Sequence, residues 1–500
     1  MELLNNLSMA FGIALDPANL LLCFLGVLCG TLVGLLPGLG PASTIALLLP
    51  VTFNLTAVQS LIMLAGIYYG AQYGGSTTSI LVNIPGEASS VVTCLDGYQM
   101  AKKGRAGPAL GIAAIGSFIG GTFAILVTMV MAPPLAQAAL KFGYPEKAAL
   151  IFFGLTMVTY LSGGSAMKSL MMAAFGLLLS CIGTDLLTGS RRFTLGIVEF
   201  YDGIGLIPVV MGLFGISEIL TNLEKPSKEV EIFDAKTKEL MPTKQDWKDS
   251  NWPIVRGSLL GVLVGLLPGA GGVLPSFFSY AMERRISKHP ERFGQGEIAG
   301  VAGPETANNA GAQSSFIPLL TLGLPCTPGL AVLAGALMIH GVTPGPLIMS
   351  QNPELFWGVV GSMYIGNVML VALNLPLIGL WIRILKIPYY FLAPLILLVC
   401  FIGAYSLNNS LVDLVIMVIF GILGYLMNKY RYPAAPLILA MVLGPMFEES
   451  FGQALILSNG SLQIFFSHPI SAALMTISLF LFVSPVVFRK RSRLKGGDTV

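Results

Sequence analysis

Charged side chains are scarce in this chain of 500 residues, and their scarcity excludes most classes of soluble protein. Only 11% of the residues are charged, whereas a soluble globular protein carries about 25%. Hydrophobic residues make up 54%, and the net charge of +3 is too small to suggest nucleic acid as a partner. The composition excludes a soluble enzyme, a nucleic-acid-binding protein and a disordered scaffold. It predicts an all-α polytopic membrane protein whose apolar surface faces lipid.

Side chains that bind transition metals or carry out acid–base chemistry are also few. The six cysteines form no CxxC pair and the three histidines are not spaced as metal ligands, so we expect neither a zinc nor a haem site. The sequence has no GxxxxGKS or GxxxxGKT motif for ATP and no HExxH motif, and its apolar segments hold no serine–histidine or paired-aspartate constellation. We therefore expect a protein that is not an enzyme and that uses no organic cofactor.

Long apolar stretches alternate with short ones along most of the chain. Because about twenty residues are needed to cross a bilayer as a helix, the pattern predicts about ten to fourteen transmembrane segments. The short stretches, flanked by Gly, Pro, Ser, Thr and Asn, predict broken helices and re-entrant hairpins. The predicted organisation is an N-terminal segment 1–18, a membrane repeat 19–221, a charged linker 222–252, a second membrane repeat 253–488 and a basic tail 489–500.

A glycine pattern that occurs twice is the evidence for the repeat. Glycines recur at every fourth position from Gly26 to Gly38 and again from Gly257 to Gly269, and both runs end in the hexapeptide VGLLPG. Shorter matches, such as the tripeptide GAQ, follow both runs in the same order. Self-similarity of this kind predicts two copies of one membrane unit.

Basic residues indicate how the two copies are oriented. Segment 100–108 of the first copy is basic, whereas the matching segment 338–346 has no formal charge. The reverse holds earlier in each copy, where 282–293 is basic and 50–60 is uncharged. Since basic loops stay on the cytoplasmic side, the copies are predicted to have inverted topology, which is typical of secondary transporters with a site near the bilayer midplane. The tail 489–500 predicts a cytoplasmic C-terminus.

A glycine–proline break lies in each copy, at 34–44 and 265–275. Proline removes a backbone donor and glycine allows a sharp turn, so backbone groups become free at membrane depth. A kink that serves only packing is the alternative for a single copy, but paired interruptions point to a binding site. The substrate-binding glycines predicted here are Gly38, Gly40, Gly269 and Gly271.

Each copy also has a cluster of neutral polar residues between apolar half-segments, at 69–90 and 303–329, with Gly-Gly or Asn-Asn available for a turn. The N-termini of half-helices can hold a carboxylate without an arginine, and free carbonyl, Asn, Ser and Thr oxygens suit a small hard cation such as sodium. Helix caps and interhelical hydrogen bonds are the alternative. The residues predicted to bind the cation are Gln72, Asn83, Glu305, Thr306 and Asn308.

Two acidic residues, Glu87 and Glu305, lie beside these clusters in a region with little other charge. A carboxylate within the membrane is costly and is therefore a functional candidate that could bind a cation or carry a proton. Capping of a half-helix from the water side is an equal alternative. Glu218 and Glu448, near later helix ends, are predicted to lie at the membrane interface.

The segments GLLPGLGPASTIALLLP (34–50), YGAQYGGSTTSILVNIPGEASS (69–90) and AGPETANNAGAQSSFIPLLTLGLPCTPG (302–329) resemble the large membrane subunit of the tripartite tricarboxylate transporters, TctA, and the similarity extends over nearly all of 15–460. The resemblance implies a secondary importer of carboxylates driven by a cation gradient, in the bacterial inner membrane, with a small membrane partner, TctB, and a periplasmic solute-binding protein, TctC. By motif it implies substrate and ion positions at Ser76, Thr77, Thr78, Ser79, Asn83, Asn308, Asn309, Gln313, Ser314 and Ser315.

The sequence thus predicts a carrier of a citrate-like carboxylate, coupled to Na⁺ or H⁺. The alternative is an ion or solute channel, or a membrane scaffold that transports nothing. Two separate, turn-rich polar clusters favour a carrier, because a pore would be lined by continuous polar stripes.

Overall fold

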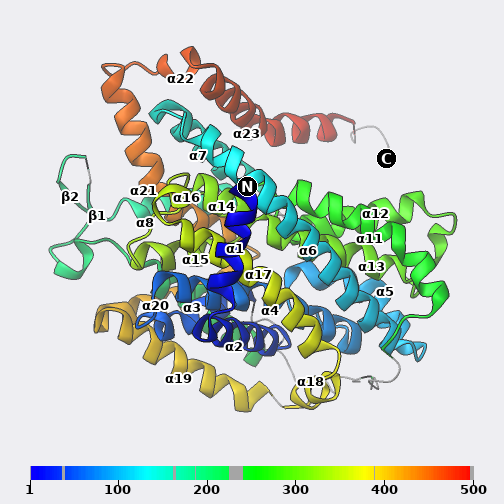
Figure 1. The fold of residues 1–500 in the computed structure, drawn as a ribbon. Helices are drawn as coiled ribbons and strands as arrows, with labels where there is room; N and C mark the ends of the chain where they lie inside the picture. The colour runs from blue at the N-terminus through cyan, green and yellow to red at the C-terminus, as the bar shows by residue number, and fades with distance from the viewer. Residues whose placement is uncertain are drawn as a thin grey trace. The chain divides into compact units, whose positions relative to one another are not determined.

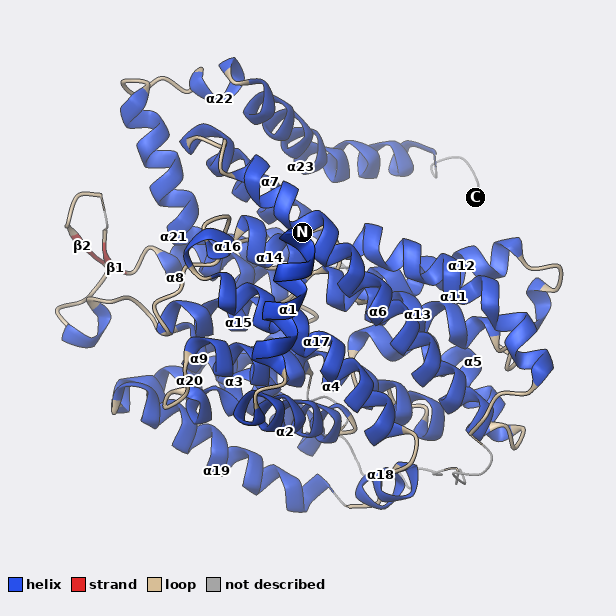
Figure 2. Ribbon diagram, viewed as in Figure 1, coloured by secondary structure: helices blue, strands red, loops and turns tan. Residues whose placement is uncertain are grey.

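The computed structural model describes residues 2–36, 40–161, 165–185, 187–224, 233, 240–387 and 389–495. These residues form helices almost throughout (Figures 1 and 2), which confirms the all-α class. The one exception is a short antiparallel ribbon of β1 (Gly183–Thr184) and β2 (Arg191–Arg192). The chain forms two units, the first from Met1–Gln137 and Ile207–Leu426 and the second from Ala138–Leu206 and Met427–Val500. This division does not follow the predicted repeats, whose boundaries stay a prediction.

The first unit holds all the elements around the predicted polar clusters. Its helices are α1 (Glu2–Ala14), α2 (Pro17–Gly34), α3 (Pro41–Leu48), η1 (Leu49–Thr52), α4 (Ala57–Val82), η2 (Ala88–Ser90), α5 (Val91–Lys102), α6 (Ala106–Ala139), α9 (Leu206–Val210), η4 (Met211–Ile216), α10 (Ser217–Glu224), α11 (Lys244–Gly265), α12 (Val273–Ile286), η6 (Pro290–Arg292), α13 (Ala299–Ser314), α14 (Phe316–Leu322), α15 (Pro328–Ile339), α16 (Ile348–Gln351), α17 (Pro353–Asn374), α18 (Ile378–Leu385), α19 (Tyr389–Asn408) and α20 (Leu411–Lys429).

The second unit is smaller and packs around α21. Gly176 on α8 lies against α21, where an added Cβ would be 2.2 Å from the carbonyl oxygen of Leu437. Arg192 binds Glu448 of α21, with Nη2 and Oε2 3.0 Å apart. Its helices are α7 (Tyr144–Leu161), α8 (Ala166–Ser180), η3 (Val198–Phe200), α21 (Ala434–Leu457), α22 (Ile464–Ser467) and α23 (Pro469–Lys495).

Six helices of the described residues are long and apolar enough to cross a membrane, so the chain is a multi-pass membrane protein. Shorter apolar helices such as α3 and α15 accompany them, and the larger count of about ten to fourteen segments stays a prediction. The spans are Pro17–Gly34, Ala106–Ala139, Leu206–Glu224, Pro353–Asn374, Leu411–Lys429 and Ala434–Leu457.

The two glycine runs form two equivalent helix seams in the first unit. A Cβ added to Gly26 or Gly30 of α2 would lie 2.2 or 2.5 Å from a carbonyl oxygen of α4. A Cβ added to Gly257 or Gly261 of α11 would lie 2.5 or 2.6 Å from a carbonyl oxygen of α13. These distances leave room only for hydrogen, so both helix pairs pack backbone against backbone, as small residues allow in membranes.

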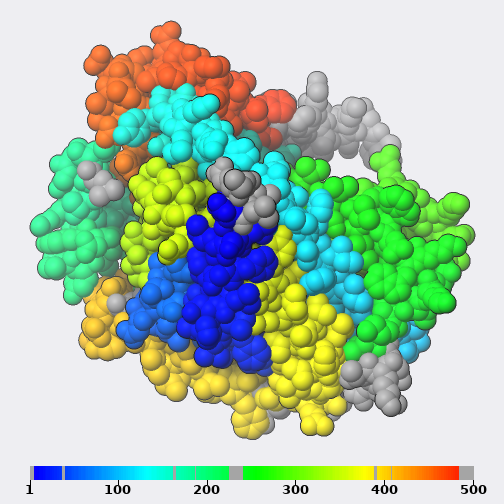
Figure 3. All heavy atoms as spheres, in the orientation of Figure 1, coloured from blue at the N-terminus to red at the C-terminus, as the bar shows by residue number. Residues whose placement is uncertain are grey.

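Helix α1 completes this unit on one face. It packs on α17, where a Cβ added to Gly361 would be 2.4 Å from the carbonyl oxygen of Ala10. Both helices reach the surface in Figure 3, α1 in dark blue beside the yellow segment that contains α17. The seams and the polar helices α4 and α13 lie inside; Ser60–Val82 of α4 is buried along its whole length.

The predicted breaks are present. Helix α2 ends at Gly34 and α3 starts at Pro41, and α11 ends at Gly265 before α12 starts at Val273. Gly38 lies outside the described residues. Each polar helix is followed by a second break, which begins at Asn83 after α4 and at Gly323 after α14, both with left-handed backbone.

The predicted turns at Gly74-Gly75 and Asn308-Asn309 are wrong, because α4 and α13 continue through them. Gly74 serves close packing instead, since its added Cβ would be 2.4 Å from the carbonyl oxygen of Thr31. Asn308 bonds to Glu87, and Asn309 bonds both to Ser117 and to the carbonyl oxygen of Glu305 one turn earlier in its own helix, so neither side chain ends the helix.

Part of the predicted linker 222–252 is helical, since α11 begins at Lys244 with Thr243 and Asp246 as a capping box. Asp246 also binds Arg105, which precedes α6. Segments 225–232 and 234–239 lie outside the described residues, as does the end of the tail beyond Lys495.

Candidate functional site

Two acidic side chains of the first unit accept hydrogen bonds across the predicted repeats. Glu305 of the second repeat is bound by residues of the first, and Glu87 of the first repeat is bound by a residue of the second. Glu305, on α13, is 1% exposed and accepts hydrogen bonds from Ser76 of α4 (Oγ to Oε2, 2.6 Å) and from Thr93 of α5. Glu87, partly buried in the break after α4, accepts one from Asn308 of α13 (Nδ2 to Oε1, 3.3 Å). These reciprocal bonds bring the two predicted polar clusters into one site.

Further hydroxyl and amide groups close the cluster. Asn309 donates to Ser117 of α6 at 2.7 Å, and Ser117 donates to the carbonyl oxygen of Glu305 at 3.3 Å. Ser89, in η2, donates its single hydroxyl proton to Glu87 or, at 3.0 Å, to Oε1 of Gln72. Five elements, α4, η2, α5, α6 and α13, thus meet in one hydrogen-bonded network.

The site has acidic groups but no basic one. Among the described residues, the ion pairs of the first unit join other groups, such as Arg105 with Asp246 and Arg256 with Glu283. A buried carboxylate without a cationic partner is costly, so a cation or a proton is needed to stabilise Glu305.

Three buried amide oxygens in the described part of α13 have no hydrogen-bond donor: Oδ1 of Asn308, Oδ1 of Asn309 and Oε1 of Gln313. Gly272, at the break before α12, lies directly on the first, since an added Cβ would be 2.3 Å from Oδ1 of Asn308. Carboxylate and amide oxygens are the donors that hard cations take. The residues present therefore fit a small monovalent cation.

The helix breaks are fastened to the polar helices beside this network. Thr78 donates to the carbonyl oxygen of Leu35 at 3.0 Å, just after α2, and Ser315 donates to that of Gly265 at 2.9 Å, at the end of α11. Ser314 donates to Val262 at 3.4 Å. For Thr78, Ser314 and Ser315, the structure thus shows the alternative of interhelical hydrogen bonds.

The breaks within each half also touch each other. The amide of Gly269 donates to the carbonyl oxygen of Cys326 at 3.0 Å, and Gly271, at φ 50°, lies against Thr327, where an added Cβ would be 2.4 Å from Cγ2. In the first half, a Cβ added to Gly86 would be 2.3 Å from the carbonyl oxygen of Gly34.

Two half-helices from different halves begin close together. Gly40 is the N-cap of α3, and Thr327 is the N-cap of α15, where its Oγ1 accepts from the amide of Leu330 at 3.1 Å. A Cβ added to Gly329 would be 3.5 Å from the amide nitrogen of Ala42. Two sets of N-terminal amides, which attract anions, therefore converge.

The remaining predicted residues do not join the network. Ser79 and Thr306 donate within their own helices, to Gly75 at 3.0 Å and Ala302 at 2.7 Å. Asn83 is exposed and caps α4, while Thr77 is buried beside a small cavity. Of the two glutamates predicted at the interface, Glu218 accepts from Asn222 of its own helix, and Glu448 binds Arg192 in the second unit.

Sequence reasoning missed four buried residues: Ser89, Thr93, Asp96 and Ser117. Ser117 had a signal, because Gly116-Ser117 matches Gly361-Ser362 between the copies. Asp96, 0% exposed on α5, accepts from the hydroxyl of Tyr280 at 2.9 Å and from three amides of the loop after α12, those of Gly294, Gly296 and Glu297. It fastens that loop of the second half to the first.

Comparison with known proteins gives a family for this chain. Residues 20–439 match the sequence model of the "Tripartite tricarboxylate transporter TctA family". An "Uncharacterized 52.8 kDa protein in TAR-I ttuC' 3'region" of Agrobacterium vitis is 51% identical, over 99% of this chain and 98% of that protein. A second protein of that organism, from the "TAR-II ttuC' 3'region", is 49% identical over 47% of this chain and 98% of its own length. No solved structure matches the chain.

Proposed function

Since the chain belongs to the tripartite tricarboxylate transporter TctA family, we propose that it carries a carboxylate across the membrane by symport with sodium. The family makes the chain a component of a transporter and not an enzyme. We propose a citrate-like tricarboxylate as substrate, import into the cell, and a bacterial inner membrane as location. The proposed partners are a small membrane subunit, TctB-like, and a periplasmic binding protein, TctC-like.

The observation that carries the proposal is the reciprocal bonding of Glu305 and Glu87 across the two halves. A cation bound at Glu305 of α13 would lie beside Ser76 and Thr93 of the first half, so its binding would affect how the two halves pack against each other. Such a link is what symport requires, because the ion and the substrate must favour the same arrangement of the protein.

The neutral oxygens around the glutamates support sodium in particular. A proton on Glu305 would offset its charge, but it would leave the oxygens of Asn308, Asn309 and Gln313 without a partner. A sodium ion would take oxygens of this kind as ligands. We therefore propose sodium, with Glu305 and Asn308 as ligands.

The converging N-termini of α3 and α15 support a site for the carboxylate. Their amides offer hydrogen bonds and the positive ends of two helix dipoles. Gly40 and Gly271 belong to the breaks beside them, and glycine lets a substrate approach the backbone. A trianionic substrate would thus be held without an arginine.

We propose further that the halves are inverted repeats that meet at this site. The inverted topology predicts that two basic segments, 100–108 and 282–293, lie on the same, cytoplasmic side. Lys103 donates to the carbonyl oxygen of Gln295, and Asp96 binds the same loop, so the two segments lie at one end of the first unit. We propose that the C-terminus, with its basic tail 489–500, also lies in the cytoplasm, as basic segments next to membrane spans do.

The test is uptake of radiolabelled citrate by membrane vesicles that contain the chain and its two partners. We expect an inward sodium gradient to drive uptake, and Glu305→Gln to lower it by about tenfold or more, because hydrogen bonds to a charged group contribute about 1.5–3 kcal/mol. The matched control is Glu354→Gln, which neutralises an exposed carboxylate in the first turn of α17 and should leave uptake unchanged.

Three outcomes would contradict the proposal. If no carboxylate is taken up under either a sodium gradient or a pH gradient, transport by this assembly is excluded. Uptake driven by a pH gradient and indifferent to sodium would replace sodium with a proton. Flux that ignores both gradients, with currents far above the turnover of a carrier, would indicate a channel.

A further inference from the structure

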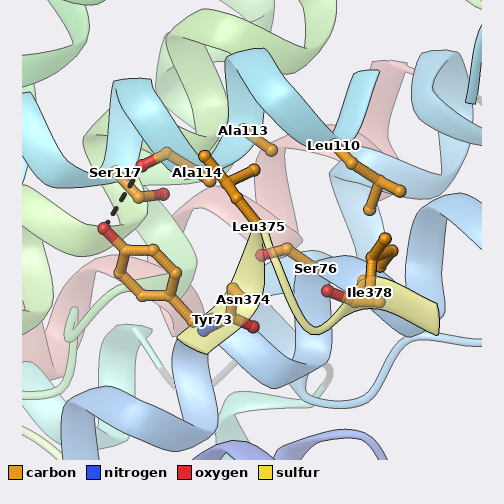
Figure 4. A pocket seen from close by; sticks show the side chains of 10 residues that line it. Tyr73, Ser76, Leu110, Ala113, Ala114, Ser117, Asn374, Leu375 and Ile378 are labelled. Atoms are coloured by element: carbon orange, nitrogen blue, oxygen red, sulfur yellow. Dashed lines mark hydrogen bonds between the residues drawn. The ribbon is translucent and has the colours of Figure 1, made fainter. Parts of the chain in front are cut away.

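A small cavity lies between α4, α6 and the corner that joins α17 to α18 (Figure 4). Its volume of about 20 Å³ is enough for one water molecule or one dehydrated monovalent cation, since a single water needs about 10–15 Å³. A citrate molecule is several times larger and cannot enter. The residues of its lining that matter below are Ser76, Leu110, Ala114, Ser117, Asn374 and Ile378.

Asn374, the last residue of α17, supplies an unused acceptor to this cavity. Its side chain is 6% exposed, and its Nδ2 donates to the carbonyl oxygen of Leu370 at 2.9 Å. Its Oδ1 is buried and has no hydrogen-bond donor among the described residues. A buried amide oxygen of this kind needs a partner, and a turn of the side chain toward the cavity would let a bound cation provide one.

The opposite wall of the cavity leads to the proposed cation site. Ser76 donates its only hydroxyl proton to Glu305 or to the carbonyl oxygen of Gln72, so the lone pairs of its oxygen stay available to a cation. Ser117 likewise bonds to the backbone of Glu305. Tyr73 also lines the cavity and is fixed by its bond to the carbonyl oxygen of Ala114, drawn in Figure 4. An ion in the cavity is therefore one hydroxyl away from Glu305.

In the proposed topology, the cavity lies near the cytoplasmic end of the first unit. Leu110, in its lining, follows the basic segment 100–108 by little more than half a helical turn. Ile378 opens α18, which buries Trp381 and exposes Arg383. Basic residues next to transmembrane segments indicate the cytoplasmic side.

We propose that this cavity is a neutral-oxygen site for one sodium ion on its way from Glu305 to the cytoplasm, with Asn374, Ser76 and Ser117 as its ligands. The inference rests on the proposed sodium symport. It adds that the ion leaves by a path too narrow for the substrate, so ion and carboxylate are released separately.

The test compares two transport modes in vesicles that hold the complete system. Net uptake of labelled citrate under an inward sodium gradient requires sodium to leave on the cytoplasmic side. Exchange of labelled for unlabelled citrate, with equal sodium on both sides, does not require it. For Asn374→Leu, which removes the oxygen at similar side-chain size, we expect net uptake to fall about tenfold and exchange to change less than about twofold.

Ala114→Val provides a second variant, because it narrows the cavity from α6 without removing a polar group. The same split between net uptake and exchange is expected, and this variant decides the matter if Asn374→Leu fails to fold. Asn428→Leu, at an exposed position of α20, is the control and should leave both modes unchanged.

If uptake by the parent chain depends on sodium but net uptake is unchanged in both cavity variants, the exit path is overturned while the proposed sodium symport stands. Equal losses of uptake and exchange would mean that the cavity residues only support the fold, and would also overturn it. Uptake by the parent chain without any dependence on sodium would overturn both the exit path and the proposed sodium symport.

Discussion

The glycine seam between α2 and α4 gives a prediction whose sign and size follow from the structure. In Gly30→Ala, the new Cβ would lie 2.5 Å from the carbonyl oxygen of Ile67 and 2.9 Å from its Cα. Ordinary contacts need about 3.5 Å, so the two backbones must separate by about 1 Å. A gap of that size weakens every contact along the seam, and overpacking of this kind costs about 1–3 kcal/mol.

Gly12→Ala is the matched control, since Gly12 is also helical and has no atom within 4 Å of an added Cβ. Alanine there should stabilise α1 by up to about 1 kcal/mol, because glycine has poor helix propensity. Thermal unfolding in detergent, followed by the loss of the monodisperse species, should therefore shift in opposite directions for the two variants. Equal Tm values for Gly30→Ala and Gly12→Ala would refute backbone-to-backbone packing at this seam.

Three further predictions concern the polar contacts. Asp96→Asn should expose the loop after α12 to proteolysis, because hydrogen bonds to a charged group contribute about 1.5–3 kcal/mol and the three amides would keep only a neutral acceptor; unchanged cleavage would contradict this. Thr78→Val and Ser315→Ala should each lower the stability of the fold by about 1 kcal/mol, because each removes one hydrogen bond. The two hydroxyls hold equivalent helix ends, so the two variants should lower Tm by similar amounts. Burial raises the pKa of Asp246, but the hydrogen bonds from Arg105 and Thr243 outweigh it and hold the pKa below its usual range. A carboxylate whose pKa is lower in the folded than in the unfolded protein stabilises the fold at pH values above the unfolded pKa of about 3.9. This stabilisation is lost as the pH falls through the folded pKa, so Asp246→Asn should remove part of the decrease in Tm at acidic pH.

The sequence was most informative where one residue type permits only one structure. Glycines at every fourth position could pack only against a backbone, and VGLLPG could only end a helix, so both seams and both breaks were predictable. Glu305 was predictable as a site residue because a carboxylate amid apolar segments needs a special environment.

The rest depended on which faces meet in the folded chain. Gly74-Gly75 can make a turn or a close helix contact, and only the position of α2 decides for contact. Asn83 and Asn308 have the same chemistry, yet one caps a helix end in the open and the other reaches Glu87. Ser117 and Thr93 look like ordinary polar residues of apolar helices until Glu305 is placed beside them.

The most direct measurement of the central claim is equilibrium binding of radiolabelled sodium to the purified protein. We expect saturable binding by the parent chain, undiminished in Glu354→Gln and lost in Glu305→Gln. Binding should be weaker in Asn308→Leu, which removes the second proposed ligand on α13 and the bond to Glu87 of the first half. Binding that is identical in all four proteins, or absent from the parent chain, would contradict a shared cation site between the halves.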